Sequence, residues 1–295
     1  ASSSNATDVG NLHTEMAGVA GASTTTHGYA QGGSGPGPPY TKYNEIQRWS
    51  FSSDGDAVDV GDMTVGKGFG HGTMSETYGY SHGGVPVATA VEKWSFASDS
   101  NAVATSNTLT LARYSPAGQS STTYGYTSGG NTSNVIEKYP FASQTNASDV
   151  GDLLFATMSM AGASSTSHGY AAGGGTTGSP YRHNQIQKYS FAASANSTDV
   201  ADLTNTRYNS TGSQSGTHGY MCGGYGSVRS NQGFFTVQQT CPECSGSGCF
   251  PGTSKTKCSD CNGQGQVRVS RNMGFSTFVT VQPCRKCSGR GMMIE

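Results

Sequence analysis

The feature that most constrains the fold is a unit that occurs five times in the first 230 residues of this 295-residue chain. Each copy contains a His/Tyr-Gly-Tyr motif and, two residues later, a pair of glycines. The second glycines of these pairs are 44 to 51 residues apart, at Gly33, Gly84, Gly130, Gly174 and Gly224. A unit of this size cannot bury a core alone, so neighbouring copies must stack on one another.

An aromatic segment follows each of the first four glycine pairs, at residues 46–51, 91–96, 136–141 and 186–191. These segments alternate apolar and polar residues, which is typical of half-buried strands. Asp-Val-Gly or Asp-Val-Ala segments come next at residues 59–61, 149–151 and 199–201. Each unit therefore provides about four short strands, which is the size of one blade of a β-propeller. We predict an all-β propeller of about five blades of four strands over residues 1–230.

The two ends of the repeat region resemble incomplete units. Residues 1–10 match residues 142–151, whereas the last unit, from Asp199, has no clear copy of the aromatic segment. We expect an N-terminal strand to complete the last blade and close the ring, because closure removes exposed sheet edges. A longer array, or blades completed by a neighbouring subunit, are the alternatives.

The repeats resemble kelch repeats. In both, a strand with a tyrosine runs into Gly-Gly and an aromatic pair follows, and Arg113 and Arg207 stand where kelch units often carry an arginine. Lys67 stands at this position in another unit. Units of this low charge and high Ser, Thr and Gly content also resemble repeats in tail-fibre and virion proteins of bacteriophages. The first resemblance implies the architecture, and the second implies a structural role in a virion.

The end of the chain carries three boxes of the form Cys-x-x-Cys-x-Gly-x-Gly, at residues 241–248, 258–265 and 284–291. The two cysteines of a box can direct two thiolates at one ion, and the glycines allow the tight turn that this requires. Seven of the eight cysteines lie after residue 240, which favours a metal cluster over a disulfide scaffold or labile Cys-x-x-Cys disulfides. Tetrahedral thiolate sites suit zinc better than an iron–sulfur cluster here. The candidate ligands are Cys241, Cys244, Cys258, Cys261, Cys284 and Cys287.

Residues 233–295 resemble the cysteine-rich zinc domain of DnaJ-type (Hsp40) chaperones. Besides the boxes, the resemblance rests on residues 233–240, 250–253 and 266–269. It implies one complete zinc site made of the second and third boxes, Cys258, Cys261, Cys284 and Cys287, which a hairpin at residues 267–281 brings together.

The same resemblance implies that Cys241 and Cys244 form half of a second zinc site, because the fourth box of the family is not in the sequence. Cys249 could supply a third thiolate and Cys222 a fourth, although for Cys222 a buried structural role is favoured. A sequence that stops short of the fourth box, or an empty half-site, is the favoured interpretation. The His-Pro-Asp tripeptide of J-domains does not occur, so a complete co-chaperone is not expected.

The charge and the motifs of the sequence limit the functions that the protein can have. The net charge is −1 and only 12% of residues are charged, which argues against a nucleic-acid partner. No apolar run is long enough to span a membrane. The sequence lacks P-loop and HExxH motifs, and its aspartates lie near predicted turns, where we expect them to cap the backbone rather than bind calcium.

We therefore predict a non-catalytic structural or binding protein rather than an enzyme. Its setting would be a phage tail, fibre or virion, or another surface assembly. Its partners would be proteins, including further copies of itself, and glycans. The alternative is a cytoplasmic chaperone-like adaptor whose zinc module binds unfolded protein segments.

Overall fold

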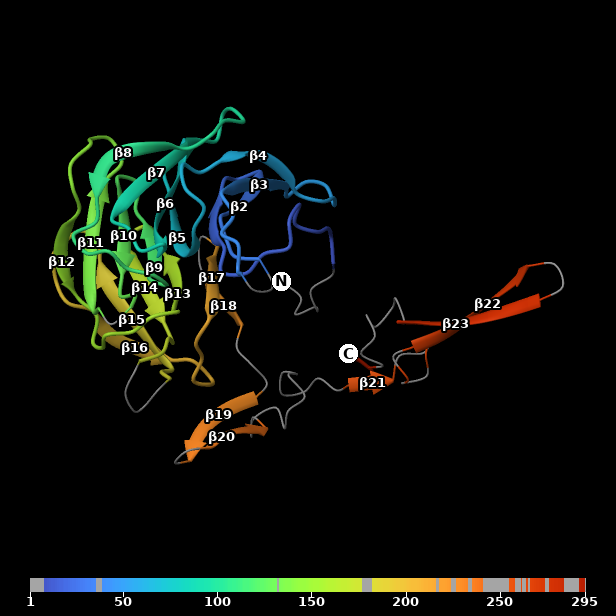
Figure 1. The fold of residues 1–295 in the computed structure, drawn as a ribbon. Coiled ribbons are helices and arrows are strands. Elements are labelled where there is room, and N and C mark those ends of the chain that lie inside the picture. The colour runs from blue at the N-terminus through green and yellow to red at the C-terminus, as the bar shows by residue number, and fades with distance from the viewer. Residues whose placement is uncertain are drawn as a thin grey trace. The chain divides into compact units, whose positions relative to one another are not determined.

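The computed structural model describes residues 8–35, 39–131, 133–176, 182–215, 218–223, 227–232, 235–240, 255–257, 261, 264, 266–273, 276–283 and 292–294 (Figure 1). These residues form 24 strands and no helix, so the predicted all-β class is confirmed. For the same reason, the described residues include no helix that could cross a membrane. The chain divides into two compact units, of which one is residues 8–224 and the other contains the described residues from 227 onward.

The first unit contains four antiparallel sheets of four strands, each built in the order of the chain. The first sheet consists of β1 (Ala20–Ser23), β2 (His27–Gln31), β3 (Glu45–Ser50) and β4 (Val58–Asp62). The second consists of β5 (Gly68–Met74), β6 (Tyr78–Val85), β7 (Ala90–Ser95) and β8 (Val103–Thr108).

The third and fourth sheets repeat this pattern. The third consists of β9 (Ala117–Ser120), β10 (Tyr124–Ser128), β11 (Val135–Pro140) and β12 (Ser148–Asp152). The fourth consists of β13 (Ala161–Ser164), β14 (His168–Ala172), β15 (Gln185–Ser190) and β16 (Thr198–Asp202). In every sheet the third strand carries the aromatic segment, as the sequence predicts.

The fifth sheet differs from the prediction of about five blades of four strands. Within the described residues it has only two strands, β17 (Ser210–Gln214) and β18 (Gly219–Gly223). The physical reason is that no aromatic segment follows Gly224 to form a third strand beside β18. The structure therefore has four complete blades and half of a fifth, and closure of the ring stays a prediction.

Successive blades pack face to face, and their first strands β1, β5, β9, β13 and β17 contact one another in that order. At each of the first three interfaces, the tyrosine of one blade's second strand packs against the phenylalanine that follows the next blade's third strand. The ring centroids are 5.0 Å apart for Tyr29–Phe96, 4.7 Å for Tyr80–Phe141 and 4.5 Å for Tyr126–Phe191. The repeated tyrosines thus fill the space between blades.

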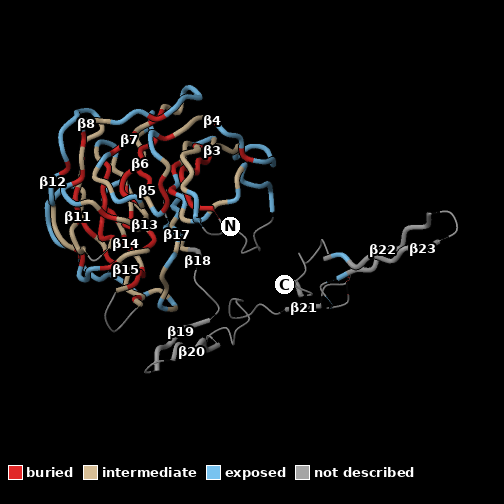
Figure 2. The backbone as a smooth tube through the Cα atoms, viewed as in Figure 1, coloured by how far each residue is buried: buried red, intermediate tan, exposed pale blue. Residues whose placement is uncertain are grey.

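In the first three blades the third strand is buried on both faces, which corrects the expectation of half-buried strands. Ile136 and Glu137 are adjacent in β11, and both side chains are fully buried. The reason is that the second and third blades each lie between two others, so the polar face of the strand is covered as well as the apolar one; in the first blade the amide of His13 bonds to Gln47 on this face. Figure 2 shows this burial running through the middle of the blades, with exposed residues on the surrounding loops.

The glycine of the second strand accommodates the aromatic ring of the third strand in each complete blade. A Cβ atom at this glycine would overlap the neighbouring ring in the pairs Gly28–Trp49, Gly79–Trp94, Gly125–Tyr139 and Gly169–Tyr189. In the four complete blades, the glycine of the His/Tyr-Gly-Tyr motif is therefore required by side-chain packing.

Replacing Gly169 by valine is expected to destabilise the protein by about 1–3 kcal/mol, because the new side chain would overpack against Tyr189. The matched control is Gly219→Val in the half blade, where the nearest atom to a new Cβ would be the Cβ of Ala163 at 3.5 Å. This control should change the free energy of unfolding by less than about 0.5 kcal/mol. Urea denaturation of both variants measures the difference, and equal destabilisation would contradict the proposed packing.

The second unit contains three strand pairs among its described residues. They are β19 (Ser227–Gln232) with β20 (Phe235–Thr240), β21 (Lys255–Lys257) with β24 (Met292–Ile294), and β22 (Gln266–Met273) with β23 (Ser276–Pro283). The predicted hairpin over residues 267–281 is confirmed and extends slightly further at each end.

Candidate functional site

The second and third cysteine boxes are each held between two strands. The second box, residues 258–265, connects β21 to β22, and the third box, residues 284–291, connects β23 to β24. In the antiparallel register, Gln266 lies opposite Pro283 and Lys257 lies opposite Met292. The strand residue before the second box is therefore paired with the one after the third box, and the residue after the second box is paired with the one before the third. This topology is suited to four thiolates that share one ion.

Cys261 is the one predicted ligand within the described residues. It is buried, with 6% of its surface exposed, and its carbonyl oxygen accepts a hydrogen bond from the amide of Gln264 at 3.0 Å. This bond closes a turn directly after the Cys-x-x-Cys pair, as a metal knuckle requires. Cys241, Cys244, Cys249, Cys258, Cys284 and Cys287 lie outside the described residues, so their ligation stays a prediction.

The residues of the two boxes fit a zinc ion chemically. Four cysteines supply only thiolate ligands, and such a closed set leaves no position for water or substrate. The glycines after each pair permit the turns, and the strand pairs hold the ends of the boxes together. A zinc ion bound here would stabilise the fold rather than carry out a reaction.

The propeller contains buried ion pairs that join loops to third strands. The Arg113 guanidinium lies 2.6 Å from the Glu137 carboxylate, and the Lys67 ammonium lies 2.8 Å from the Glu92 carboxylate. Both side chains of the first pair are fully buried. Burial lowers the pKa of Arg113, and the nearby Glu137 charge opposes this shift. The kelch-like arginine position is therefore a structural ion pair in this chain.

The polar residue of the third strand has a second, recurrent role. Its oxygen accepts a hydrogen bond from an amide in the loop that precedes the first strand of its own blade. The distances are 2.9 Å for His13–Gln47, 2.7 Å for Thr64–Glu92, 2.6 Å for Thr110–Glu137 and 2.7 Å for Leu154–Gln187. The strand carries glutamate where the loop supplies Lys67 or Arg113, and glutamine where the loop supplies Met16 or Thr157. Sequence reasoning missed this role, because the alternating pattern placed these side chains in solvent.

The aspartates of the Asp-Val-Gly segments cap the backbone, as predicted. The carboxylate of Asp59 accepts a hydrogen bond from the amide of Gly61 at 3.1 Å, and Asp149 does the same for Gly151 at 3.0 Å. Within the part of the chain that the structure describes, no three His, Cys, Asp or Glu side chains gather as a metal site. Asp59 and Asp149 lie within β4 and β12, at the irregularity where the register with the third strand shifts, rather than in turns.

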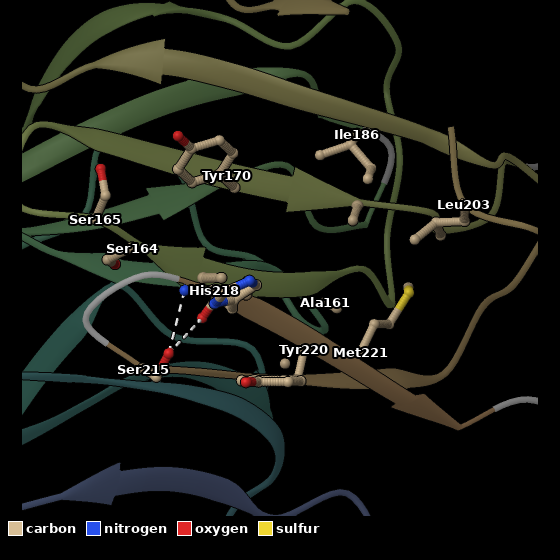
Figure 3. Close-up of a pocket in the computed structure, with 15 residues that line it drawn as sticks. Ala161, Ser164, Ser165, Tyr170, Ile186, Leu203, Ser215, His218, Tyr220 and Met221 are labelled. Atoms are coloured by element: carbon tan, nitrogen blue, oxygen red, sulfur yellow. Dashed lines mark hydrogen bonds between the residues drawn. The ribbon is translucent and has the colours of Figure 1, made fainter. Parts of the chain in front are cut away.

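A pocket of about 340 Å³ lies between the fourth blade and the half blade (Figure 3). The fourth blade contributes Tyr170, Ile186 and Leu203, and the half blade contributes Gly219 and Met221. Figure 3 shows the side chains of Tyr170, Ile186, Leu203 and Met221 around one space. The hydrogen bonds between Ser215 and His218 lie at its edge. In the sequence, this pocket is indicated by the absence of an aromatic segment after Gly224.

These features define a class: an all-β protein that joins a propeller-type repeat domain to a module of cysteine knuckles. Residues 241–295 match the model of the DnaJ central domain. The DnaJ-like assignment of these residues is therefore confirmed. The likeness of the repeats to kelch and phage repeats stays a prediction.

Two comparisons with curated proteins concern the same end of the chain. It is 46% identical over 61 residues to the chaperone protein DnaJ of Dictyoglomus thermophilum, a match that covers 21% of this chain and 16% of the relative. It is 55% identical over 49 residues to the DnaJ of Pelagibacter ubique, covering 17% and 12%. The chain thus spans less than a fifth of the length of these relatives.

The propeller has a structural neighbour. The chain superposes on the solved structure of YjhT with a TM-score of 0.60, over 76% of this chain and 84% of that chain. The sequence identity is 9%, so the similarity concerns the fold alone.

Proposed function

We propose that this protein is a non-catalytic binding protein in which the propeller presents recognition surfaces and the cysteine module is a zinc-stabilised docking piece. The observation that carries this proposal is the use of the buried charges. Among the described residues, the buried Lys, Arg, Asp and Glu side chains are Lys67, Glu92, Arg113 and Glu137, and all of them are joined in two structural ion pairs. The buried charges are thus used for packing blades, whereas catalysis needs titratable groups aimed at a substrate.

The setting we propose is a surface assembly such as a phage tail, fibre or virion, with proteins and glycans as partners. The support is the repeat composition, rich in Ser, Thr, Gly and Tyr, because such residues on propeller loops suit hydroxyl-rich or protein surfaces. A second candidate is a chaperone-like adaptor, cytoplasmic in location. The relatives of residues 241–295 carry the name chaperone protein DnaJ, which favours this candidate for the zinc module.

Two assays on the full chain separate the candidates. In the first, the protein and its Cys261→Ser variant are mixed with a chemically denatured model enzyme, and aggregation is followed by light scattering. The adaptor should suppress aggregation, and the variant should lose this effect. In the second assay, both proteins are applied to a glycan array, where a surface-assembly protein should bind independently of Cys261. The binding proposal would be contradicted if the protein neither suppressed aggregation nor bound glycans and instead catalysed the turnover of a substrate.

A further inference from the structure

The pocket beside the half blade has the composition of an interface between blades from which one partner is missing. At the first three interfaces, three side chains of one blade enclose the third-strand aromatic ring of the next. In the second blade these are Tyr80, Val91 and Leu109, and they pack in one cluster with Tyr139 of the third blade. In the fourth blade, the equivalent side chains are Tyr170, Ile186 and Leu203, and all three line the pocket.

These side chains are less buried in the fourth blade than their equivalents are in the first three blades. Ile46, Val91 and Ile136 are fully buried, whereas the equivalent Ile186 is partly exposed. Leu109 and Leu153 are 3% and 2% exposed, and the equivalent Leu203 is also partly exposed. In the described residues, the half blade places Met221 against this surface of the fourth blade but no third-strand aromatic ring.

The half blade retains the glycine on which such a ring would lie. In the four complete blades, the second-strand glycine is covered by the third-strand ring. At Gly219, the equivalent residue, the nearest atom to a Cβ would be that of Ala163 at 3.5 Å. Within the described residues, β18 is hydrogen-bonded to β17 on one side and to no strand on the other. As far as the described residues go, neither a ring covers Gly219 nor a strand pairs with this edge of β18.

We propose that this edge binds an extended segment of a partner polypeptide, with the pattern Val/Ile-Glu-x-Trp-x-Phe, as the third strand of the fifth blade. The tryptophan would lie on Gly219 within the pocket, and the phenylalanine would stack on Tyr170. This inference rests on the proposed binding function and specifies the chemistry of one partner. Its mode is strand addition to an exposed sheet edge, in which backbone hydrogen bonds provide affinity and side-chain pockets provide specificity.

Tryptophan is preferred to tyrosine because of the residue that faces the ring from the preceding blade. Thr73 and Gln119 face tyrosines and bond to their hydroxyl groups: Thr73 contacts the Tyr139 hydroxyl, and the Tyr189 hydroxyl donates to Gln119 at 2.8 Å. Ala22, at the same position in the first blade, packs in one cluster with Trp94. The fourth blade has Ala163 at this position, by the matching register of β1 and β13 with their neighbours. A tyrosine hydroxyl would find no hydrogen-bond partner in this side chain.

Glutamate is preferred because of the loop that precedes β17. Arg207 stands at the repeat position of Lys67 and Arg113, whose partners are the third-strand glutamates. The carbonyl groups of Lys67, Arg113 and Arg207 each accept a hydrogen bond from the glycine pair of the previous blade, which fixes the equivalence. A glutamate in the added strand would thus lie beside a cation, as in the second and third blades.

The occupant is not a third strand of a second folded copy. In the described residues, β3, β7, β11 and β15 are each hydrogen-bonded to strands on both sides. A folded copy therefore has no third strand to donate, and we assign the edge to a segment that is extended before it binds.

The test uses the full chain and a fluorescent peptide that copies residues 89–98, whose Glu92, Trp94 and Phe96 match the pattern. Fluorescence anisotropy should show binding in the micromolar range. A peptide with the Trp94→Ala change should bind on the order of 100-fold more weakly, because truncation of a buried aromatic ring removes most of its packing. A peptide of residues 184–193, which carries glutamine and tyrosine instead, should bind on the order of 10-fold more weakly.

The protein variant Gly219→Val should lose binding, because its side chain would occupy the seat of the ring. The control Val103→Ala, on an exposed position of β8, should bind as the unchanged protein does. The proposal would be overturned if the tryptophan peptide and its alanine variant bound equally, or if no peptide bound. It would also be overturned if Gly219→Val bound the peptide as the unchanged protein does. So would a concentration-dependent dimer that Gly219→Val abolishes in sedimentation experiments, since this would assign the edge to a second copy. None of these outcomes alters the aggregation and glycan assays, which test the proposed function separately.

Discussion

Removal of zinc by a chelator is expected to unfold the module after residue 233 and to leave the propeller folded. The described strand pairs of this module are hairpins and short ladders, which are marginal without further support. Binding of a structural zinc supplies about 10–16 kcal/mol in small domains of this kind, so its loss removes the main source of folding free energy. The propeller, by contrast, has its own buried core of stacked aromatic rings.

Hydrogen exchange followed by mass spectrometry measures this outcome in both units of the full chain. Protection should vanish in β22 and β23 and persist in the four complete blades. A colorimetric indicator should find one zinc ion per chain, and Cys261→Ser should release it. The control Cys241→Ser should keep one zinc ion, since the first box belongs to the half-site. Unchanged protection of the module after zinc removal would refute this account.

Replacing Arg113 by threonine is expected to destabilise the protein by about 3–5 kcal/mol, because Glu137 would be left buried without its cation. The pair Arg113→Thr with Glu137→Gln copies Thr157 and Gln187 of the fourth blade, and should be more stable than either single variant. Midpoints of urea denaturation give these differences.

The control for this series is Arg48→Ala. Arg48 forms an ion pair with Asp99, but both side chains are partly or largely exposed. Exposed pairs contribute up to about 1 kcal/mol, so this variant should remain close to the unchanged protein. A loss below about 1 kcal/mol for Arg113→Thr would show that the buried pair is not important for stability.

Much of the fold follows from local pattern. The glycine pairs, the aromatic segments and the spacing of the units predict strands and blades correctly, because strand formation depends on short-range alternation and turn residues. The backbone capping by Asp59 and Asp149 follows in the same way, since each cap joins residues two positions apart, although the structure places both in strands rather than turns. The hairpin between the cysteine boxes is also confirmed.

The number of complete blades was not predicted correctly, although the missing aromatic segment was visible. A blade count from repeats assumes that each unit supplies four strands, whereas the fifth supplies two in the described residues. Its pocket depends on the fourth blade as well, because Tyr170, Ile186 and Leu203 surround the space that the absent strand leaves.

The sequence by itself determined the repeat, the strand class and the DnaJ-like cysteine boxes, because each of these depends on residues that are close along the chain. Only the tertiary structure decided that Glu92 and Glu137 are buried beside Lys67 and Arg113, and that Gly219 faces open space rather than a ring. The physical reason is that these properties depend on what the neighbouring blade places against a residue. Alternation along one strand describes its two faces, and stacking of the blades determines what covers each of them.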